Sequence, residues 1–227
     1  MKNTWLICWF TISLVLVAVM DIGPATASSD AKKTPTPASV SKTKEPLLPR
    51  PEQEKKANAL FQEIFKLAQE GERTANLPRI IELYQEIINK YPEAPLAQES
   101  YWRLIEINLR DFSPPRNDKA LGLFDEFRAK YPDSPLMKVV QGTMARTFYL
   151  AGNWQELLAV VGTASEEINA PKEVQRPLTI FYYSEAKFHL NDPGEAARGF
   201  RALIRNFPDF QGSKTASERI AAIEKGN

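Results

Sequence analysis

The sequence has very little cysteine and histidine, two residues on which much enzyme and metal chemistry depends. It contains a single cysteine, Cys8, and a single histidine, His189, among 227 residues. A disulfide framework and a cysteine metal site are therefore excluded within the chain, and a histidine metal site or a Ser–His or Cys–His pair lacks its partners. The ten glycines are scattered and form no phosphate-binding loop. We therefore expect no enzymatic activity, no metal and no small-molecule cofactor.

An excess of charge of one sign is also missing. The 29 Lys and Arg residues balance 28 Asp and Glu residues, so the net charge of +1 provides no field to steer nucleic acid or an anionic surface. No useful length of sequence alternates apolar and polar residues as a half-buried strand does. The hydrophobic content of 43% is ordinary for a globular protein. The composition thus predicts an all-α domain with a packed core and no nucleic-acid partner.

The one long apolar run lies at the N-terminus. Lys2 precedes the apolar stretch 5–20, and residues 25–27, Ala-Thr-Ala, provide the small-x-small pattern of a signal-peptidase site. The stretch has 16 residues, whereas a membrane span needs about 20. We predict a cleaved signal peptide over 1–27, with cleavage near Ala27-Ser28, and a periplasmic or secreted protein. The alternative is an inner-membrane anchor facing the periplasm, in which case only this segment would contact the membrane.

The next segment, 28–51, is rich in Ser, Thr, Ala, Lys and Pro. Its few apolar residues offer little burial to offset the entropy of ordering, and its prolines favour an extended backbone. We predict a disordered linker over 28–51 and a helical repeat domain over 52–227.

One short phrase divides the rest of the chain into repeats. Tyr-Pro-Glu-Ala-Pro-Leu at 91–96 recurs forty residues later as Tyr-Pro-Asp-Ser-Pro-Leu at 131–136, and Phe-Pro-Asp-Phe at 207–210 is a weaker copy. Between these phrases, apolar residues recur at helical spacing. A fixed period of this size is typical of a solenoid of helix pairs. We predict about four helix pairs and a polar C-terminal capping helix over 214–225. Prolines are expected to start four of the helices, at Pro78, Pro95, Pro135 and Pro177.

The last pair carries the most complete repeat pattern. Ser184 and Ala196 are small residues at positions of close helix contact, Phe200 is an aromatic residue in the second helix, and Pro208 ends that helix. This pattern resembles the tetratricopeptide repeat. The resemblance implies a right-handed superhelical solenoid of helix-turn-helix pairs, in which the first helix of each pair lines a concave face.

The Tyr-Pro-acid-small-Pro phrase and its forty-residue spacing are similar to those of repeats in bacterial envelope proteins. Proteins of this kind include the lipoprotein component of the outer-membrane β-barrel assembly machine and the coordinator protein of the Tol–Pal system. The resemblance implies an adaptor that works through protein–protein contacts in the periplasm.

The repeat register predicts which residues line the concave face. For the aromatic residues, the alternative is packing between helices, because aromatic stripes are usually buried. For the two charged residues Arg146 and Glu185 we expect exposure, because unpaired charges are rarely buried. His189 lies at a helix end, where its ring suits the C-terminal carbonyls, and Trp154 is expected to have a structural role at the start of a second helix. The predicted face contains Trp102, Leu109, Arg146, Tyr149, Tyr182, Glu185 and His189.

Aromatic and arginine side chains are common anchors of protein interfaces. We therefore expect an exported adaptor that holds an extended or helical segment of another envelope protein in this face. Two alternatives stay open. One is an enzyme, or its accessory domain, acting on peptidoglycan or polysaccharide, and the other is a structural scaffold anchored in the membrane by residues 1–27.

Overall fold

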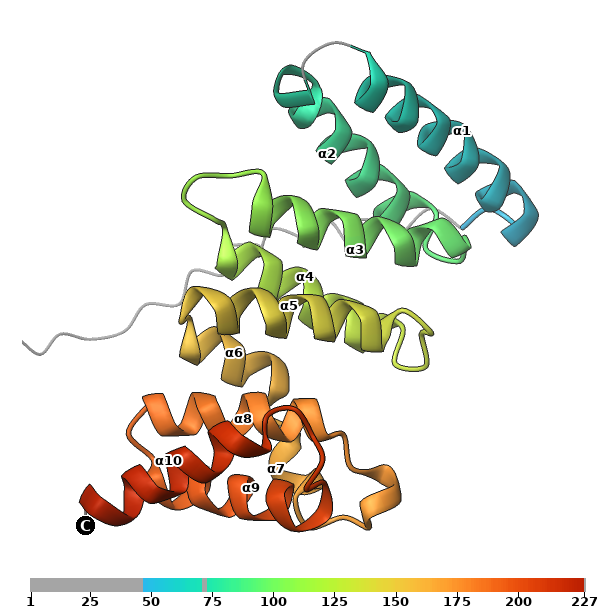
Figure 1. Ribbon diagram of the computed structural model, residues 1–227. Helices are drawn as coiled ribbons and strands as arrows, with labels where there is room; N and C mark the ends of the chain where they lie inside the picture. Colours follow the sequence, from blue (N-terminus) through green and yellow to red (C-terminus); the bar gives the residue numbers. More distant parts are fainter. Residues whose placement is uncertain (1–46, 71–72, 227) are drawn as a thin grey trace, which may run out of the picture. The chain divides into compact units, whose positions relative to one another are not determined.

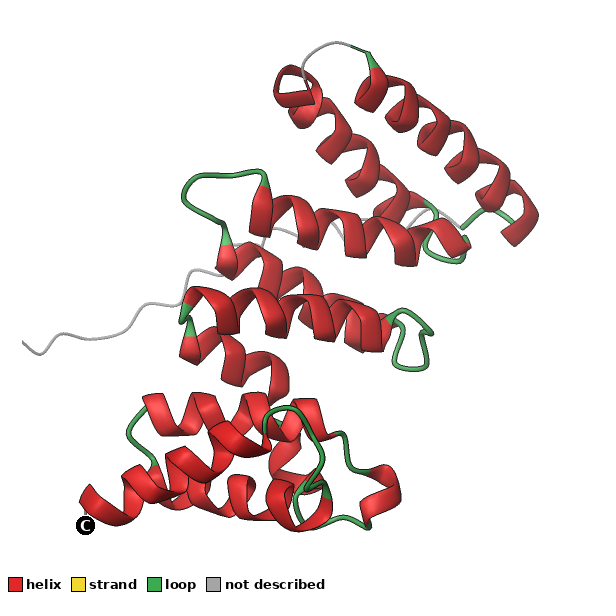
Figure 2. Cartoon of the chain, viewed as in Figure 1, coloured by secondary structure: helices red, strands yellow, loops and turns green. Residues whose placement is uncertain are grey.

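The computed structural model describes residues 47–70 and 73–226, and every regular element in this part of the chain is a helix (Figures 1 and 2). The predicted all-α class is therefore confirmed for the described residues. The predicted signal peptide, 1–27, and most of the predicted linker lie outside them. Within the described ranges, no helix has both the length and the apolar character needed to cross a membrane. The elements are α1 (Arg50–Gln69), α2 (Arg73–Lys90), α3 (Pro95–Arg110), α4 (Asn117–Lys130), α5 (Met137–Ala151), α6 (Trp154–Val161), α7 (Ala164–Glu167), the 3-10 helix η1 (Lys172–Val174), α8 (Pro177–His189), α9 (Pro193–Asn206) and α10 (Ser213–Gly226).

Helices that follow one another in the chain pack side by side. Helix α1 contacts α2, α3 contacts α4, α5 contacts α6, α8 contacts α9, and α10 packs against α9. Neighbouring pairs are joined by α3 against α1 and α2, by α6 against α4, and by α8 against α5 and α6. We call α1, α3, α5 and α8 the first helices of the four pairs. The segment between α6 and α8 contains α7 and η1, two short helices that the sequence pattern did not predict.

The recurring Tyr-Pro phrase forms turns between pairs, and its two full copies contact each other. The hydroxyl of Tyr131 donates a hydrogen bond to the carbonyl of Pro92 (2.7 Å), which lies in the equivalent turn one repeat earlier. The hydroxyl of Ser134 donates to Oε1 of Gln98 (2.6 Å) in the first turn of α3. The two full copies of the phrase therefore form two turns in contact, and the second turn is fixed against the first.

The predicted start of α2 is wrong. The helix begins at Arg73, and Pro78 lies inside it. The side-chain amide of Asn76 donates hydrogen bonds to the carbonyls of Leu67 (2.8 Å) and Glu70 (2.7 Å). These bonds satisfy carbonyls at the end of α1 that have no partner within that helix, and they fix the first turn of α2 well before the proline.

Two other helix starts differ from the prediction. Helix α5 begins at Met137 rather than Pro135, because a turn intervenes in which the N–H of Met137 donates to the carbonyl of Ser134 (3.1 Å). Helix α1 begins at Arg50, inside the predicted linker, with a proline in its first turn, where no N–H is required. The starts of α3 at Pro95 and α8 at Pro177 agree with the prediction.

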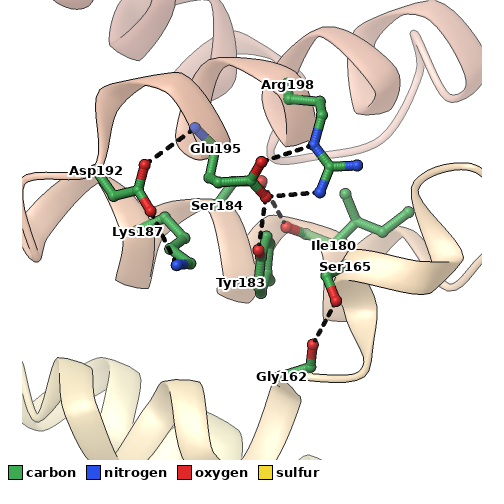
Figure 3. Close-up of polar contacts among 9 residues, drawn as sticks. All are labelled: Gly162, Ser165, Ile180, Tyr183, Ser184, Lys187, Asp192, Glu195 and Arg198. Carbon is green, nitrogen blue, oxygen red and sulfur yellow. Dashed lines mark hydrogen bonds and ion pairs between the residues drawn. The ribbon is translucent and has the colours of Figure 1, made fainter.

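Helices α8 and α9 approach each other closely where small residues meet. A Cβ atom added to Gly199 would lie 2.0 Å from Oγ of Ser184, so only glycine fits there without movement. At the turn between the helices, Asp192 accepts hydrogen bonds from the N–H of Glu195 (3.3 Å) and from Nζ of Lys187 (2.9 Å) (Figure 3). The cap and the small-residue contact together fix the angle and position of this last pair.

Candidate binding face

The seven residues predicted to line a concave face are carried by three first helices. Trp102 and Leu109 lie on α3, Arg146 and Tyr149 lie on α5, and the other three lie on α8. The α5 and α8 residues meet in one aromatic and charged cluster. The structure also shows that several of them are buried, which changes what each can do.

Leu109 is 4% exposed and cannot contact a partner, so its placement on the accessible face is wrong. The physical reason is that α3 lies between two pairs and contacts α1, α2 and α4, which bury more than one of its faces. Trp102 is half-buried against the core. The guanidinium of Arg103 lies 4.6 Å from the centroid of the Trp102 ring. The indole N–H of Trp102 is buried and has no acceptor among the described residues.

Tyr149 and Tyr182 belong to an aromatic cluster between α5 and α8. The ring centroid of Tyr149 lies 5.0 Å from that of Tyr182, 5.9 Å from Phe181 and 5.9 Å from Trp154. Tyr182 is buried, and Tyr149 is half-buried. Burial raises the pKa of both phenols, so both are neutral at physiological pH. Core packing, the alternative reading of these aromatics, is therefore correct for Tyr182.

Glu185 is 1% exposed, so the prediction that it lies in the open is wrong. Its two carboxylate oxygens accept hydrogen bonds from Nε (2.8 Å) and Nη2 (3.1 Å) of Arg219 on α10. Two hydrogen bonds from one arginine offset the desolvation cost of burying a carboxylate. The prediction failed because this partner lies 34 residues later, on the terminal helix. Glu185 therefore fixes α10 to α8.

His189 is exposed at the end of α8 and stacks on Trp154, with ring centroids 3.9 Å apart and an angle of 5° between the planes. Its Nε2 lies 3.8 Å from a carboxylate oxygen of Glu185. Trp154 is the first residue of α6, as predicted. The stacked pair thus joins the ends of two helices, and the histidine has a packing role.

The accessible part of this region is a stripe along α5. We define the α5 stripe as the exposed residues Lys138, Val139, Gly142, Arg146 and Leu150. Their spacing of one, four, eight and twelve residues from the first places them on one side of a helix. Helix α5 contains no Asp or Glu, and neither cation of the stripe has a carboxylate partner among the described residues. Of the predicted residues, Arg146 is the one charged side chain that the structure leaves unpaired.

Sequence reasoning missed four exposed apolar residues on the first helices. Among the described residues, six large apolar side chains are exposed. Four of the six lie on first helices: Phe65 on α1, Val139 and Leu150 on α5, and Leu178 on α8. The helical period would have grouped Val139 and Leu150 with Arg146, because all three lie on one side of α5. Phe65 and Leu178 had no such neighbour in the predicted set.

A groove of about 530 Å³ lies between α1, α2 and α3. Apolar side chains form much of its lining, including Phe61, Phe65 and Ile80. Charged residues of α3 line one side and pair with one another: Arg103 lies 3.2 Å from Glu106, which also lies 3.3 Å from Arg110. We call this the α1–α3 groove. It contains none of the seven predicted residues.

Reaction chemistry gains no support from these surfaces. Within the described ranges, no group of three or more His, Cys, Asp or Glu side chains is placed to hold a metal ion. Comparison of the chain with protein-family models and with curated proteins found no match.

Proposed function

We propose that the protein is an exported, non-catalytic adaptor that binds another protein of the bacterial envelope through its first helices. In this proposal the four helix pairs form a tetratricopeptide-like, right-handed solenoid, and the first helices line its concave side. The observation that carries the proposal is that, in the part of the chain that the structure describes, four of the six exposed large apolar side chains lie on first helices. Exposed apolar side chains are common anchors when a surface binds a protein partner.

Two further observations support parts of this proposal. The hydrogen bond from Tyr131 to Pro92 joins equivalent turns of successive pairs, which favours a stacked array over an irregular bundle. The apolar run and the Ala-Thr-Ala site at 25–27 favour export.

The test compares two matched pairs of substitutions in affinity capture from the native cells. Val139→Asp with Leu178→Asp places two charges on the first helices. Leu47→Asp with Val174→Asp places two charges on exposed apolar residues elsewhere. The proposal predicts that the first pair lowers recovery of the partner at least about tenfold and that the second pair leaves it unchanged. The reason is that altering an interface anchor weakens the binding free energy by more than about 1 kcal/mol.

Each variant must keep the thermal unfolding transition of the parent, which excludes misfolding as the cause. Equal recovery from the parent and from both double variants would overturn the assignment of the binding face. Loss of recovery in the second pair alone would also overturn it, and would place the interface near η1 and the start of α1.

A further inference from the structure

We propose that the α5 stripe binds an extended acidic segment of the partner protein, in which two carboxylates flank one apolar side chain. This inference deepens the proposed function and depends on it. It adds the chemistry of the ligand and the position of each contact. Three observations support it. The two cations of the α5 stripe, Lys138 and Arg146, have no carboxylate partner among the described residues, a hollow lies beside the stripe, and the distance between the two cations is set by the helix.

Among the described residues, Arg146 differs from most arginines because it has no carboxylate partner, and Lys138, which lines the hollow beside the stripe, has none either. Arg103, Arg176 and Arg219 each form an ion pair with a glutamate. Lys138 and Arg146 are exposed and have no carboxylate partner among the described residues. Complementary charge across an interface provides specificity and faster association. The unpaired cations therefore favour a negatively charged partner segment.

A small hollow of about 150 Å³ lies between α5 and α8, beside the stripe. Ala145, Val161, Leu178 and Tyr182 are among its lining residues. A Cβ atom added to Gly142, which also lines it, would meet no other atom within 4 Å, so space is open above this position. The lining is mainly apolar in character, and the hollow thus suits a single apolar side chain of the partner.

Arg176 lies at the edge of this hollow, and its charge is already paired with a carboxylate. Its guanidinium pairs with Glu167, and its Nη1 donates a hydrogen bond to Oε1 of Gln141 (2.8 Å). This arginine holds the start of α8 against α5 and offers no free charge to a ligand. The cations available for recognition are therefore those of the stripe.

The spacing along α5 predicts the spacing in the partner. Lys138 and Arg146 are eight residues apart, which is about 12 Å along a helix, and Gly142 lies midway between them. In an extended chain, residues i, i+2 and i+4 point to the same side, and i and i+4 are about 13 Å apart. The pattern acidic-x-apolar-x-acidic therefore places two carboxylates at the cations and the apolar side chain at the hollow.

The test is selection of random twelve-residue peptides, displayed on phage, against the full chain. The expected result is enrichment of peptides with two Asp or Glu residues four positions apart and an apolar residue between them. Binding of the enriched peptides should weaken at least about tenfold in the double variant Lys138→Glu/Arg146→Glu, because attraction becomes repulsion at both contacts.

Two control variants make the result specific. Lys55→Glu/Lys214→Glu changes the net charge equally at exposed lysines of α1 and α10, and it should bind the peptides as the parent does. Gly142→Leu should fill the space above the hollow and abolish binding without harm to folding, because no neighbour lies within 4 Å and leucine favours a helix.

The outcomes separate this inference from the proposed function. Enriched peptides that lack acidic residues, yet lose binding with Gly142→Leu, would overturn the acidic chemistry and leave the adaptor face standing. Acidic residues at a helical spacing of eight would overturn the extended conformation. Failure to enrich any peptide, with binding of the chain to anionic phospholipid vesicles that Lys138→Glu/Arg146→Glu abolishes, would overturn both in favour of a membrane surface.

Discussion

The α1–α3 groove and the α5 stripe both lie on first helices, but they balance their charges differently. In the groove, Arg103 pairs with Glu99 (2.7 Å) and Glu106 (3.2 Å) within one helix. On α5, Lys138 and Arg146 have no carboxylate partner among the described residues. A charge that is already paired within its own helix adds little to recognition of a partner. The groove should therefore select its partner by shape and by apolar burial. The stripe should select by charge.

A third arrangement separates structural from binding charges. Glu185 and Arg219 are paired between α8 and α10, and the carboxylate is buried. A buried pair is costly to break because the remaining charge loses its compensation, whereas an exposed pair contributes little. The same type of ion pair therefore has different roles in different parts of the chain, and the substitutions below test these differences.

The largest effect should come from the buried pair. Arg219→Met leaves the carboxylate of Glu185 buried without its cation, and we expect the free energy of unfolding to fall by about 3 kcal/mol. Arg103→Met at the α1–α3 groove should change it by less than about 1 kcal/mol. Urea denaturation of both variants checks the comparison. Equal effects would contradict the structural role of the buried pair, and Glu185→Gln added to Arg219→Met should recover part of the loss.

A smaller effect should distinguish the closely packed α8–α9 contact from the open α5 stripe. Gly199→Ala places a Cβ atom 2.0 Å from Oγ of Ser184, and overpacking of this kind typically lowers stability by about 1–3 kcal/mol. Gly142→Ala meets no atom within 4 Å and should raise stability by about 0.5–1 kcal/mol, because alanine favours a helix over glycine. Thermal unfolding of the two variants provides the measurement. If both substitutions lowered stability, or both raised it, the packing described at Gly142 or at Gly199 would be contradicted.

Salt should separate the two binding surfaces. Phe65→Ser in the α1–α3 groove should weaken binding of the native partner about tenfold at any ionic strength, because it removes apolar contact. Lys138→Ala with Arg146→Ala should weaken binding at about 0.1 M salt and have little effect at about 1 M, where the Debye length falls from about 10 Å to about 3 Å. Isothermal titration at both salt concentrations measures this. An effect of Phe65→Ser that disappears at high salt would contradict the distinction.

The smallest effect concerns pH and the turn between α8 and α9. A hydrogen bond from Lys187 lowers the pKa of Asp192 below its ordinary value of 3.8. Arg198 and then the hydroxyl of Tyr183 lower the pKa of Glu195 below its ordinary value of 4.5. Because both folded-state pKa values are lowered, this stabilisation is present above the ordinary values and is lost as the pH falls through the lowered ones.

The expected consequence is a decrease in stability of less than about 1 kcal/mol in the acid range, since both side chains are partly exposed. Asp192→Asn with Glu195→Gln should show a weaker dependence on pH below 4.5 than the parent chain. Urea denaturation at several pH values between about 6 and 3 measures the slope. An identical slope in both proteins would contradict the role assigned to this turn.

Much of the fold could be predicted because its signals are local. Pro95 and Pro177 start helices as expected, and both full copies of the repeated phrase form turns between helix pairs. Arg146 could also be placed on an exposed side, from the repeat register and because unpaired charges are rarely buried. The start of α2 was wrong because Asn76 caps the end of α1, and this contact depends on two helices at once.

The candidate site was less predictable because burial depends on distant residues. Glu185 is buried since Arg219, 34 positions later, supplies its partner. Leu109 is buried because α3 is covered by helices from both neighbouring pairs. Leu178 is exposed although it lies in the first turn of a helix whose middle residues are buried. No pattern within a single helix contains this information.

The central claim is that the first helices bind a protein partner, and photo-crosslinking in the native cells tests it most directly. A crosslinking residue at position 146 lies on the α5 stripe, and one at position 218 lies at an exposed residue of α10. The account predicts a discrete adduct from position 146 that Leu178→Asp abolishes, and none from position 218. Adducts of equal yield from both positions, or from 218 alone, would contradict it.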